Sequence, residues 1–402
     1  MRSRVLSGMR PTGALHLGHY HGALKNWVQL QDLHDCYYFV ADWHALTTHY
    51  ESREVIERNV FEMVIDWVAA GLDPARSTIF LQSRLPEHAE LFTLLAMGTP
   101  LGWLERVPTY KDQIDKLKDR DLATYGFLGY PLLQAADILI YKATYVPVGE
   151  DQSSHVELTR EVARRFNHLY GRPPDFDAQV EAALALLSRD DARYFDKQRK
   201  AYGETGSVDA LAKGEAVLRK AAVAVSGWTP SRTELLAGHL RGSGRTVLVE
   251  PTALHTEVAK LPGLDGGKMS KSYGNTIAMR EPAAQVEAKI RRMPTDPQRV
   301  RRTDPGNPER CPVWQFHQVY SDAATREQVA AGCTSAGIGC LECKQPVIDA
   351  ILREQLPWRE RAAELVADPA RVRAIVDEGT VRARDTARQT MSEVRAAMGL
   401  DY

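Results

Sequence analysis

Two histidines and a glycine lie together near the start of the chain, in the segment His16-Leu17-Gly18-His19. The apolar run RVLSGM precedes this signature segment and predicts a buried strand, and apolar residues at helical spacing follow it. At such a junction the first turn of the helix presents free N–H donors, which favour a phosphate. The two histidines share a face of that turn, and Gly18 allows close approach of a nucleotide. Scattered surface histidines are the alternative for this pattern alone.

A second group of residues suited to phosphate chemistry lies far along the chain, in Lys268-Met269-Ser270-Lys271-Ser272. Glycines flank this lysine loop, so it can move and close over a triphosphate. The two lysines would then stabilise the negative charge that develops as pyrophosphate leaves. Taken alone, the composition is equally typical of a solvated surface loop.

The third candidate site is a set of four cysteines, Cys311, Cys333, Cys340 and Cys343, separated by 21, 6 and 2 residues. Four thiolates that include a C-x-x-C pair can hold tetrahedral zinc or an iron–sulfur cluster. Core cysteines that meet by chance are the alternative. Cys36 lies in the apolar run CYYFVAD and is predicted to be a packed core thiol.

The elements that must position these residues alternate between strand and helix in the first 170 residues. RVLSGM, CYYFVAD and STIFLQS predict strands, and EVIERNVFEMVIDWVAAGL predicts a long amphipathic helix. This alternation predicts an α/β fold with a parallel sheet covered by helices on both faces. Ligands of such sheets bind at the carboxyl ends of strands, where Gly8, Asp42 and His44 are expected. TVLVEPTAL predicts a further strand after an Ala-rich helical stretch.

Length and composition bound the kind of protein. A chain of 402 residues with 44% apolar residues and a net charge of −1 predicts two or three globular lobes. A nucleic-acid partner therefore requires a local basic surface, and KIRRMPTDPQRVRR, with six Lys or Arg between Lys289 and Arg302, is the candidate. The sequence has no transmembrane-length apolar run and no signal-peptide core, which predicts a cytoplasmic protein without a membrane partner.

The signature segment and the lysine loop together resemble the HIGH and KMSKS motifs of class I aminoacyl-tRNA synthetases. The segments SGMRPTGALHLGHYHGAL, VADWHALTT, YPLLQAADILIY and VPVGEDQSSHVELTREVARRFN are similar to tryptophanyl-tRNA synthetases. Many members of that family carry Thr and Asn in place of the two histidines. The resemblance implies activation of L-tryptophan to tryptophanyl-adenylate with ATP and Mg²⁺. It also implies transfer of tryptophan to the 2′-OH of the terminal adenosine of tRNA-Trp, by a homodimer.

The same resemblance implies roles for individual residues. Asp137 matches the carboxylate that accepts the indole N–H, and a buried acceptor placed for one donor discriminates strongly. Catalytic roles fall to His16, His19, Lys268 and Lys271. ATP binding is implied for Arg10, Pro11, Thr12, Gly18, His19, Gly149, Glu150, Asp151, Leu261, Lys268, Met269, Ser270, Lys271 and Ser272. Tryptophan binding is implied for Asp137, Gln134, His44 and Gln152.

Domain organisation and the cysteine site also follow from the resemblance. It implies a Rossmann-type catalytic domain in two parts, 1–172 and 246–282, interrupted by a helical insertion at 173–245. An α-helical anticodon-binding domain at 283–402 follows and carries the four cysteines. Their spacing resembles that of the tryptophanyl enzymes that bind a 4Fe–4S cluster, and zinc is the alternative.

Three other functions remain open on the sequence. Gln134 three residues before Asp137 also resembles the substrate-binding pair of tyrosyl-tRNA synthetases, whereas VGEDQ and VADWHALT favour tryptophan. A small-molecule nucleotidyltransferase also uses an H-x-G-H element, but the lysine loop and the long helical C-terminal part argue against it. An RNA-binding paralogue with a relict site is disfavoured by the intact lysines, histidines and Asp137.

Overall fold

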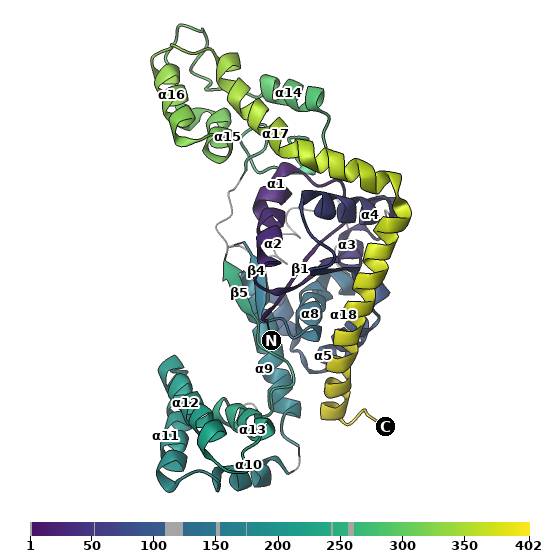
Figure 1. Ribbon diagram of the computed structural model, residues 1–402, viewed down its shortest axis with the longest axis vertical. Coiled ribbons are helices and arrows are strands. Elements are labelled where there is room, and N and C mark those ends of the chain that lie inside the picture. The colour runs from purple at the N-terminus through teal and green to yellow at the C-terminus, as the bar shows by residue number, and fades with distance from the viewer. Residues whose placement is uncertain are drawn as a thin grey trace. The chain divides into compact units, whose positions relative to one another are not determined.

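The described residues of the computed structural model are 2–51, 53–108, 124–149, 153–173, 175–242, 244–255 and 261–402. They contain a five-stranded sheet of order β3-β2-β1-β4-β5. Figure 1 labels β1, β4 and β5 of this sheet. This order, with the first strand in the middle, is that of Rossmann-type sheets, so the predicted α/β fold is confirmed. The strands are β1 (Arg4–Met9), β2 (Asp35–Val40), β3 (Ser77–Leu81), β4 (Tyr145–Val148) and β5 (Thr252–His255).

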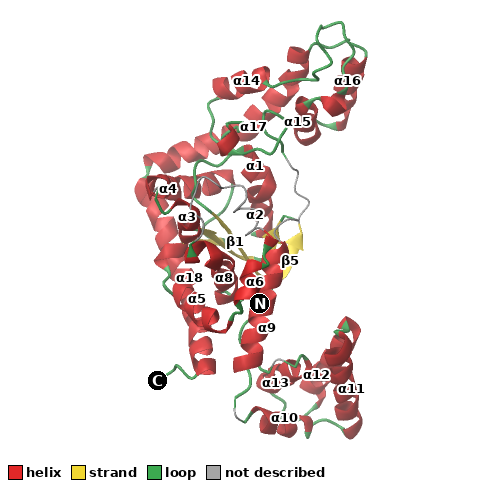
Figure 2. Ribbon diagram, turned by 180° about the vertical axis from the view of Figure 1, so that it is seen from behind, coloured by secondary structure: helices red, strands yellow, loops and turns green. Residues whose placement is uncertain are grey.

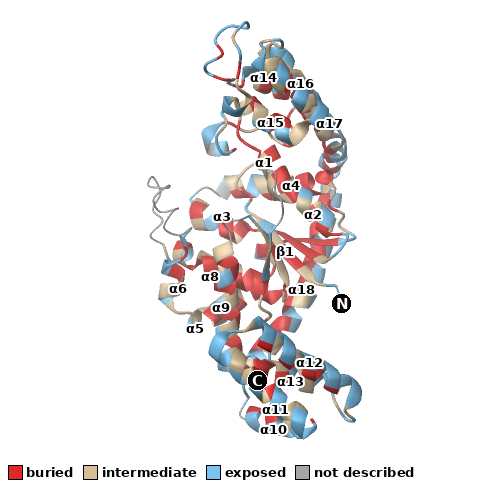
Figure 3. Ribbon diagram, turned by 90° about the vertical axis from the view of Figure 1, so that its left-hand side faces the viewer, coloured by how far each residue is buried: buried red, intermediate tan, exposed pale blue. Residues whose placement is uncertain are grey.

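Strands β1, β2 and β3 run parallel, and their register places their carboxyl ends at one edge. Met9 pairs with Val40, and Val40 pairs with Leu81. All five residues of β3 and the last five of β2 are buried (Figure 3), because helices cover both faces of a parallel sheet. Cys36 is among these buried residues, as predicted. The carboxyl ends of these strands therefore meet as predicted, with Gly8 next to the last residue of β1 and Asp42 two residues after β2, and ligand binding at this edge stays a prediction.

The chain divides into two compact units. The first comprises Met1–Arg84, Pro147–Glu150 and His255–Val381, and the second comprises Leu85–Val146, Asp151–Leu254 and Arg382–Tyr402. Helical elements before residue 85 are α1 (Leu17–His19), η1 (Tyr20–Leu24), α2 (Lys25–Leu30), α3 (Asp42–His49), α4 (Arg53–Ala70) and η2 (Gln82–Arg84). The long helix predicted from EVIERNVFEMVIDWVAAGL is α4, and it ends before Gly71, whose φ of 118° favours glycine.

The C-terminal part of the chain is helical from Ala283 onward, as predicted (Figure 2). Its elements are α14 (Ala283–Arg292), η5 (Pro308–Arg310), α15 (Pro312–Tyr320), α16 (Ala323–Thr334), α17 (Cys340–Ala367) and α18 (Pro369–Met398). α17 packs against α14 and α15 and also against α4 of the sheet layer. In the part of the chain that is described, no helix combines the length and apolar character that crossing a membrane requires.

The second unit carries the helices that follow β3, together with the Ala-rich stretch. Before residue 172 these are α5 (Glu87–Gly98), α6 (Leu101–Glu105), α8 (Tyr125–Ile140) and α9 (Ser153–Tyr170). Four further helices, α10 (Phe176–Leu184), α11 (Arg189–Thr205), α12 (Val208–Ala224) and α13 (Pro230–Leu240), share an apolar core of their own around Phe176, Phe195 and Leu236. A stretch that buries its own core is consistent with the predicted insertion at 173–245.

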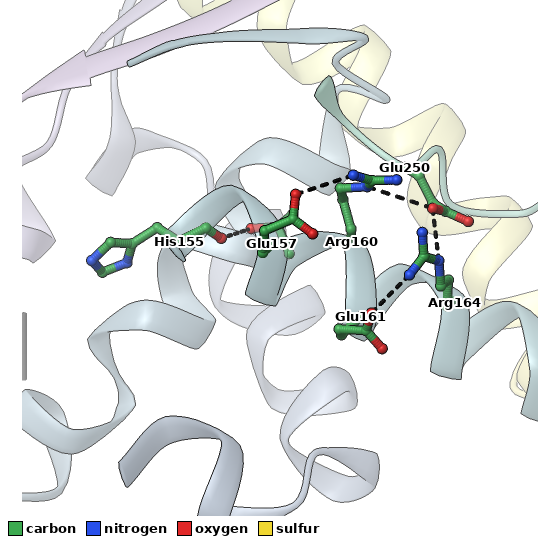
Figure 4. A network of polar contacts seen from close by, with 7 residues as sticks. His155, Glu157, Arg160, Glu161, Arg164 and Glu250 are labelled. Atoms are coloured by element: carbon green, nitrogen blue, oxygen red, sulfur yellow. Dashed lines mark hydrogen bonds and ion pairs between the residues drawn. The ribbon is translucent and has the colours of Figure 1, made fainter. Parts of the chain in front are cut away.

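The segment 247–250, which follows this helical stretch, is bonded to α9, the helix that precedes the stretch. Arg164 Nε lies 2.9 Å from Glu250 Oε2, and Arg160 Nε lies 3.7 Å from the same oxygen (Figure 4). The Asn167 side chain accepts from the backbone N–H groups of Val247 and Leu248 at 2.9 and 3.0 Å. The two ends of the stretch are thereby joined at one place.

The strand predicted over TVLVEPTAL is shorter than expected. Only Thr252–His255 is a strand, so the prediction was wrong for the residues before it. The physical reason is that the Asn167 amide occupies the backbone donors of Val247 and Leu248. Hydrogen bonds to the Asn167 side chain on α9 therefore replace the strand-to-strand hydrogen bonds that the β-branched residues predicted.

Candidate active site

The signature segment begins directly after the loop that leaves β1, and its two histidines meet. Their ring centroids lie 3.7 Å apart, and the His16 backbone N–H donates to His19 Nδ1 at 3.2 Å. Since His19 Nδ1 accepts, the proton of the neutral ring is on Nε2. The structure therefore places both predicted imidazoles on one turn, as their i, i+3 spacing predicts.

Both imidazoles are neutral at physiological pH. Burial, strengthened by the positive charge of Lys271, lowers the pKa of His16 to about 4. Burial, His16 and Lys271 together lower the pKa of His19 to about 3. His16 Nδ1 is buried and has no hydrogen-bond partner among the described residues. The histidines can therefore donate hydrogen bonds to a phosphate, but they do not bring positive charge to it.

The lysine loop is organised by a buried amide. Asn275 Nδ2 donates to Asp265 Oδ1 at 2.8 Å and to the Lys268 carbonyl at 3.0 Å, and its Oδ1 accepts from the Ser270 N–H at 2.8 Å. A Cβ on Gly263 would lie 2.1 Å from Asn275 Nδ2, so the close approach requires glycine there. Asn275 was not predicted as a site residue, although it ends the same Gly- and Lys-bearing stretch.

The lysine loop and the signature segment are in contact, although they lie 251 residues apart. The Gly18 N–H lies 3.3 Å from Met269 Sδ. His16 and Ala278 form an antiparallel bridge, flanked by Leu17 N–H to Ile277 O at 3.0 Å and Met279 N–H to Leu15 O at 2.9 Å. The chain that leaves the lysine loop is thus bonded to the chain that enters the signature segment.

Lys271 lies over the loop that precedes the signature segment. A Cβ on Gly13 would be 2.9 Å from Lys271 Nζ, and the φ of Gly13 is 138°. Both the lack of space and the backbone conformation therefore favour glycine at this position. Lys271 as a whole residue is exposed, but its ammonium end lies against this loop. Desolvation of that end lowers the pKa of Lys271 to about 8, while Asp66 acts in the opposite direction. A bound triphosphate would favour the charged form.

A π-helical turn follows the signature segment and fixes it to the C-terminal helices. η1 spans Tyr20–Leu24, and its His21 Nε2 lies 2.8 Å from the Tyr320 hydroxyl and 3.2 Å from Glu354 Oε2. Tyr320 in turn donates to Glu354 at 3.0 Å, and Tyr20 packs on Trp358. Such π-turns are rare and are found mostly at functional sites. Here the turn brings His21 to α15 and α17, whereas His16 and His19 contact each other and feel the charge of Lys271.

On the second unit, Asp137 belongs to a fully buried polar chain in which His88 is the middle member. Asp137 Oδ1 lies 2.6 Å from His88 Nδ1, and His88 Nε2 lies 2.7 Å from the Tyr141 hydroxyl. Asp137 and His88 are both 0% exposed. Gln134, one turn earlier on α8, is half-buried. His88 was not predicted, because nothing near it in the sequence points to a partner 49 residues away.

The remaining predicted site residues are placed as follows. Pro11, His44, Leu261 and Met269 are buried, Thr12, Gly18 and Ser270 are half-buried, and Arg10, Gly149 and Lys268 are exposed. Ser272 lies in η4 (Lys271–Tyr273). Glu150, Asp151 and Gln152 lie outside the described residues. Arg10, Pro11 and Thr12 form the loop between β1 and the signature segment, with Thr12 N–H bonded to Arg10 O at 2.8 Å.

The four cysteines gather where α15, α16 and α17 meet. Cys311 precedes α15, Cys333 lies in α16, and Cys340 and Cys343 lie in the first turn of α17. Burial and then the negative fields of the other three thiols raise the pKa of Cys343 to about 12. In the described ranges, however, no three His, Cys, Asp or Glu side chains are arranged to hold a metal ion. The donor chemistry fits a thiolate-bound group, and the metal site stays a prediction.

The basic segment before these cysteines is not uniformly available to a partner. Arg299 is buried and donates to the carbonyls of Arg302 and Ile338 at 3.0 and 2.7 Å. Lys289 pairs with Glu281, and Arg291 with Glu287. Arg292, Arg301 and Arg302 are exposed, and Arg302 pairs with Glu342 at 3.4 Å. Four of the six basic residues of the predicted cluster therefore have partners within the fold.

A comparison with protein families assigns the class. The model of the class I tRNA synthetases for tryptophan and tyrosine (W and Y) matches residues 1–191 and 233–353, which is more than half of the chain. The chain belongs to this family, and to its tryptophanyl members, as the following relatives indicate. The matched ranges leave out 192–232, which lies inside the helical stretch of the second unit.

The relatives cover the whole chain. A tryptophan–tRNA ligase of Ralstonia nicotianae is 64% identical over 99% of this chain and 99% of its own length. One of Thermotoga maritima is 43% identical over 99% of this chain and all of its own. Among solved structures, tryptophanyl-tRNA synthetase from Campylobacter jejuni, complexed with ADP and tryptophan, has a TM-score of 0.73 at 27% identity. The match spans 99% of this chain and 100% of the Campylobacter jejuni chain.

Proposed function

We propose that this chain is a tryptophan–tRNA ligase that forms tryptophanyl-adenylate from L-tryptophan and ATP and then esterifies tRNA-Trp. The observation that carries the proposal is the contact of the signature segment with the lysine loop, Gly18 N–H to Met269 Sδ at 3.3 Å. It brings two neutral imidazoles and a lysine to one place, as a triphosphate-activating site requires. The tyrosine alternative is not favoured, since whole-length relatives at 64% and 43% identity are tryptophan–tRNA ligases.

In the activation step the tryptophan carboxylate attacks the α-phosphorus, and the bond to the bridging oxygen of pyrophosphate breaks. His16 and His19 donate hydrogen bonds to the phosphate chain from the first helical turn, where backbone N–H groups also point. Lys268 and Lys271 stabilise the charge that collects on the departing pyrophosphate. Mg²⁺, which aminoacyl-tRNA synthetases use with ATP, supplies further charge neutralisation on the phosphates.

Selection of tryptophan is assigned to Asp137. Its carboxylate accepts the indole N–H, and His88 holds it from the other side at 2.6 Å. A complex with an amino acid that lacks the indole N–H would leave this buried acceptor without that hydrogen bond. Binding would then be weaker by the desolvation free energy of the carboxylate, so such an amino acid is rejected. The resemblance to tryptophanyl-tRNA synthetases also implies tryptophan-binding roles for Gln134, His44 and Gln152.

Amino-acid-dependent ATP–pyrophosphate exchange, run with each of the twenty amino acids, tests the proposal. Exchange with tryptophan is expected to exceed exchange with every other amino acid. Exchange with tyrosine but not tryptophan would contradict the assignment. A nucleotidyltransferase would exchange pyrophosphate with no amino acid present, and a relict RNA-binding protein would not exchange at all.

Transfer to tRNA-Trp is assigned to the full chain, with residues 283–402 as the anticodon-binding domain. The exposed Arg292, Arg301 and Arg302 are the groups that can contact tRNA phosphates. The catalytic domain then consists of 1–172 and 246–282, with the insertion between them. We expect the enzyme to work in the cytoplasm, where charged tRNA is used.

A homodimer is supported by apolar side chains exposed on the second unit. Met97 is 75% exposed, Leu101 56% and Tyr125 70%, and they lie on α5, α6 and α8, of which α5 and α6 both pack on α8. A second copy of the chain would bury such a patch. Light scattering is expected to give twice the chain mass, and Leu101→Asp is expected to give monomers. A wild-type monomer would contradict the dimer.

The cysteine set is proposed to bind a 4Fe–4S cluster, held by Cys311, Cys333, Cys340 and Cys343. The support is four soft sulfur donors that already act on one another's charge. The thiols have to turn toward one point, after which the group would pin α15, α16 and α17 together. Anaerobically purified protein is expected to be brown, with about four irons per chain. One zinc per chain would replace the cluster with the zinc alternative, and free alkylation of all four thiols would exclude both.

A further inference from the structure

A buried carboxylate on α4 lies at the junction of the two phosphate-binding motifs. Asp66 is 3% exposed and comes from a helix that carries no motif residue. Asp66 Oδ1 lies 2.5 Å from Arg280 Nε, and the other end of the Arg280 guanidinium binds Glu62, one turn earlier on α4. A buried carboxylate is costly unless charged and hydrogen-bonded groups compensate it, so its placement calls for an explanation.

The neighbours of Asp66 come from both motifs. Arg280 lies at the end of the segment that leaves the lysine loop, directly after the Met279 and Ala278 bridge to Leu15 and His16. The Leu15 backbone, one residue before the signature segment, lies close enough to Asp66 to lower its pKa slightly, against the larger effect of burial. The carboxylate is thus bonded through Arg280 to the outgoing chain of the lysine loop, and the bridge at Ala278 and Met279 joins that chain to the one that enters the signature segment.

The same carboxylate acts on the catalytic lysine. The field of Asp66 favours the charged form of Lys271, in opposition to desolvation. The charged groups around the site are Arg280 and Lys271, which are positive, and Glu62, which is negative, with neutral His16 and His19 beyond Lys271. Loss of the Asp66 charge removes an electrostatic effect that favours the charged form of Lys271.

We propose that Asp66, with Arg280, is a positioning residue for amino-acid activation: it clamps the outgoing chain of the lysine loop against the signature segment. The proposal rests on the proposed function, because it assigns the clamp to the ATP-using step. Asp66 does not touch substrate; it acts through Arg280 and Lys271. The rest of the outgoing segment is held independently, since Gln355 and Arg359 of α17 donate to the carbonyls of Ala278 and Glu281 at 2.9 and 3.1 Å.

The test compares Asp66→Asn, Arg280→Met and Arg280→Lys with the wild type in tryptophan-dependent ATP–pyrophosphate exchange. Asp66→Asn keeps the shape and removes the charge. We expect kcat/KM for ATP to fall about 10- to 100-fold, while the Kd of tryptophan changes less than twofold. Arg280→Met should behave similarly, Arg280→Lys should recover part of the loss, and the double variant should lose little more than either single one.

The pH profile separates positioning from a structural role. The alkaline limb of kcat/KM for ATP reports the free enzyme, where Lys271 has a pKa of about 8. Without Asp66 that limb is expected to move to lower pH, because the electrostatic effect that favours the charged form of Lys271 is lost. A loss of thermal stability alone would leave the limb in place. Asp35→Asn is the matched control, since Asp35 pairs with Arg4 at the opposite end of β1 at 3.5 Å, and it should leave both readouts unchanged.

Two results would overturn the proposal. One is an Asp66→Asn enzyme with wild-type kcat/KM for ATP and an unmoved alkaline limb. The other is a loss shared equally by Asp35→Asn. If Asp66→Asn does not fold, the two Arg280 variants provide the test. A kcat/KM for ATP of Arg280→Met equal to that of the wild type would then overturn the proposal. A wild-type protein without tryptophan-dependent exchange would instead reject the proposed function itself.

Discussion

Two histidines of this molecule have opposite surroundings, and the difference separates two kinds of site. His16, in the signature segment, is buried, yet its Nδ1 has no hydrogen-bond partner among the described residues. His88, in the second unit, is also buried, but its two ring nitrogens bind Asp137 and Tyr141 at 2.6 and 2.7 Å. Buried polar groups are normally satisfied, so an unsatisfied one has its partner elsewhere.

Under the proposed function, the ATP-side groups are completed by substrate, whereas on the tryptophan side both ring nitrogens of His88 are already bonded and hold Asp137 in place for the indole N–H. Groups completed by substrate act most strongly when charge develops in the transition state. Groups that are already bonded to one another fix the shape and charge of a pocket and so select its occupant. Substitutions on the two sides should therefore alter different kinetic constants.

The largest effect is expected from Lys271→Ala. Removal of a group that stabilises developing charge should slow adenylate formation about 10²- to 10³-fold, with tryptophan affinity of the free enzyme unchanged. Single-turnover formation of adenylate and a tryptophan titration measure the two quantities. Lys213→Ala, on the helical insertion, is the control. Weaker tryptophan binding with an unchanged activation rate would break the division between the two sides.

Asp137→Asn should have the next largest effect, and on the other side of the comparison. The amide loses charge assistance and can present an N–H where the indole needs an acceptor. We expect kcat/KM for tryptophan to fall about 10²-fold, and discrimination against tyrosine and phenylalanine to fall with it. Exchange assays with the three amino acids measure this. If selectivity were unchanged, Gln134, one turn away on α8, would become the specificity residue.

His88→Gln tests whether the partner of Asp137 matters as well as Asp137 itself. Glutamine can bond to Asp137 or to Tyr141 but cannot reproduce both ring contacts. A loss of about tenfold in kcat/KM for tryptophan is expected, with kcat/KM for ATP at saturating tryptophan changed less. Tyr141→Phe, which removes only the outer hydroxyl, should cost less than His88→Gln. The reverse order would show that the chain of hydrogen bonds does not support the carboxylate.

The two segments proposed to bind ATP were accessible from the sequence because their residues lie in short, continuous stretches. His16, Gly18 and His19 are on one turn, and Lys268 to Ser272 form one loop, so spacing alone predicts their shared use. The sheet followed in the same way, since β1, β2 and β3 read as apolar runs of strand length.

What the sequence did not reveal depends on contacts between distant residues. His88 meets Asp137 across 49 positions, and Asp66 meets Arg280 across 214. No local pattern distinguishes these side chains from ordinary polar residues of amphipathic helices. The first part of the strand predicted over TVLVEPTAL did not form for the same reason. The side-chain amide of Asn167, 80 positions before Val247, binds the backbone N–H that a neighbouring strand would have used.

The smallest effect at assay pH is expected from titration of the signature histidines. Their pKa values are lowered to about 4 and about 3 in the fold, from 6.5 when exposed. A base with a lowered pKa stabilises the native state above its unfolded pKa. That stability is lost as pH falls from about 6.5 toward 4, because the unfolded chain then binds protons that the native state excludes. The free energy of unfolding changes by about 1.4 kcal/mol per pH unit for each proton that the unfolded chain binds and the native state does not.

Urea unfolding at pH 7.0, 6.0 and 5.0, with the wild type and a His16→Gln/His19→Gln variant, measures this contribution. The variant has no titrating ring at these positions, so its free energy of unfolding should fall less steeply with falling pH. Asp66 acts in the opposite sense, since its pKa is raised to about 6, but it is present in both proteins and cancels in the difference. Parallel curves would mean that the histidines are not held neutral by the fold. The donors available to ATP would then include charged imidazoles, and the contrast with the completed His88 site would be lost.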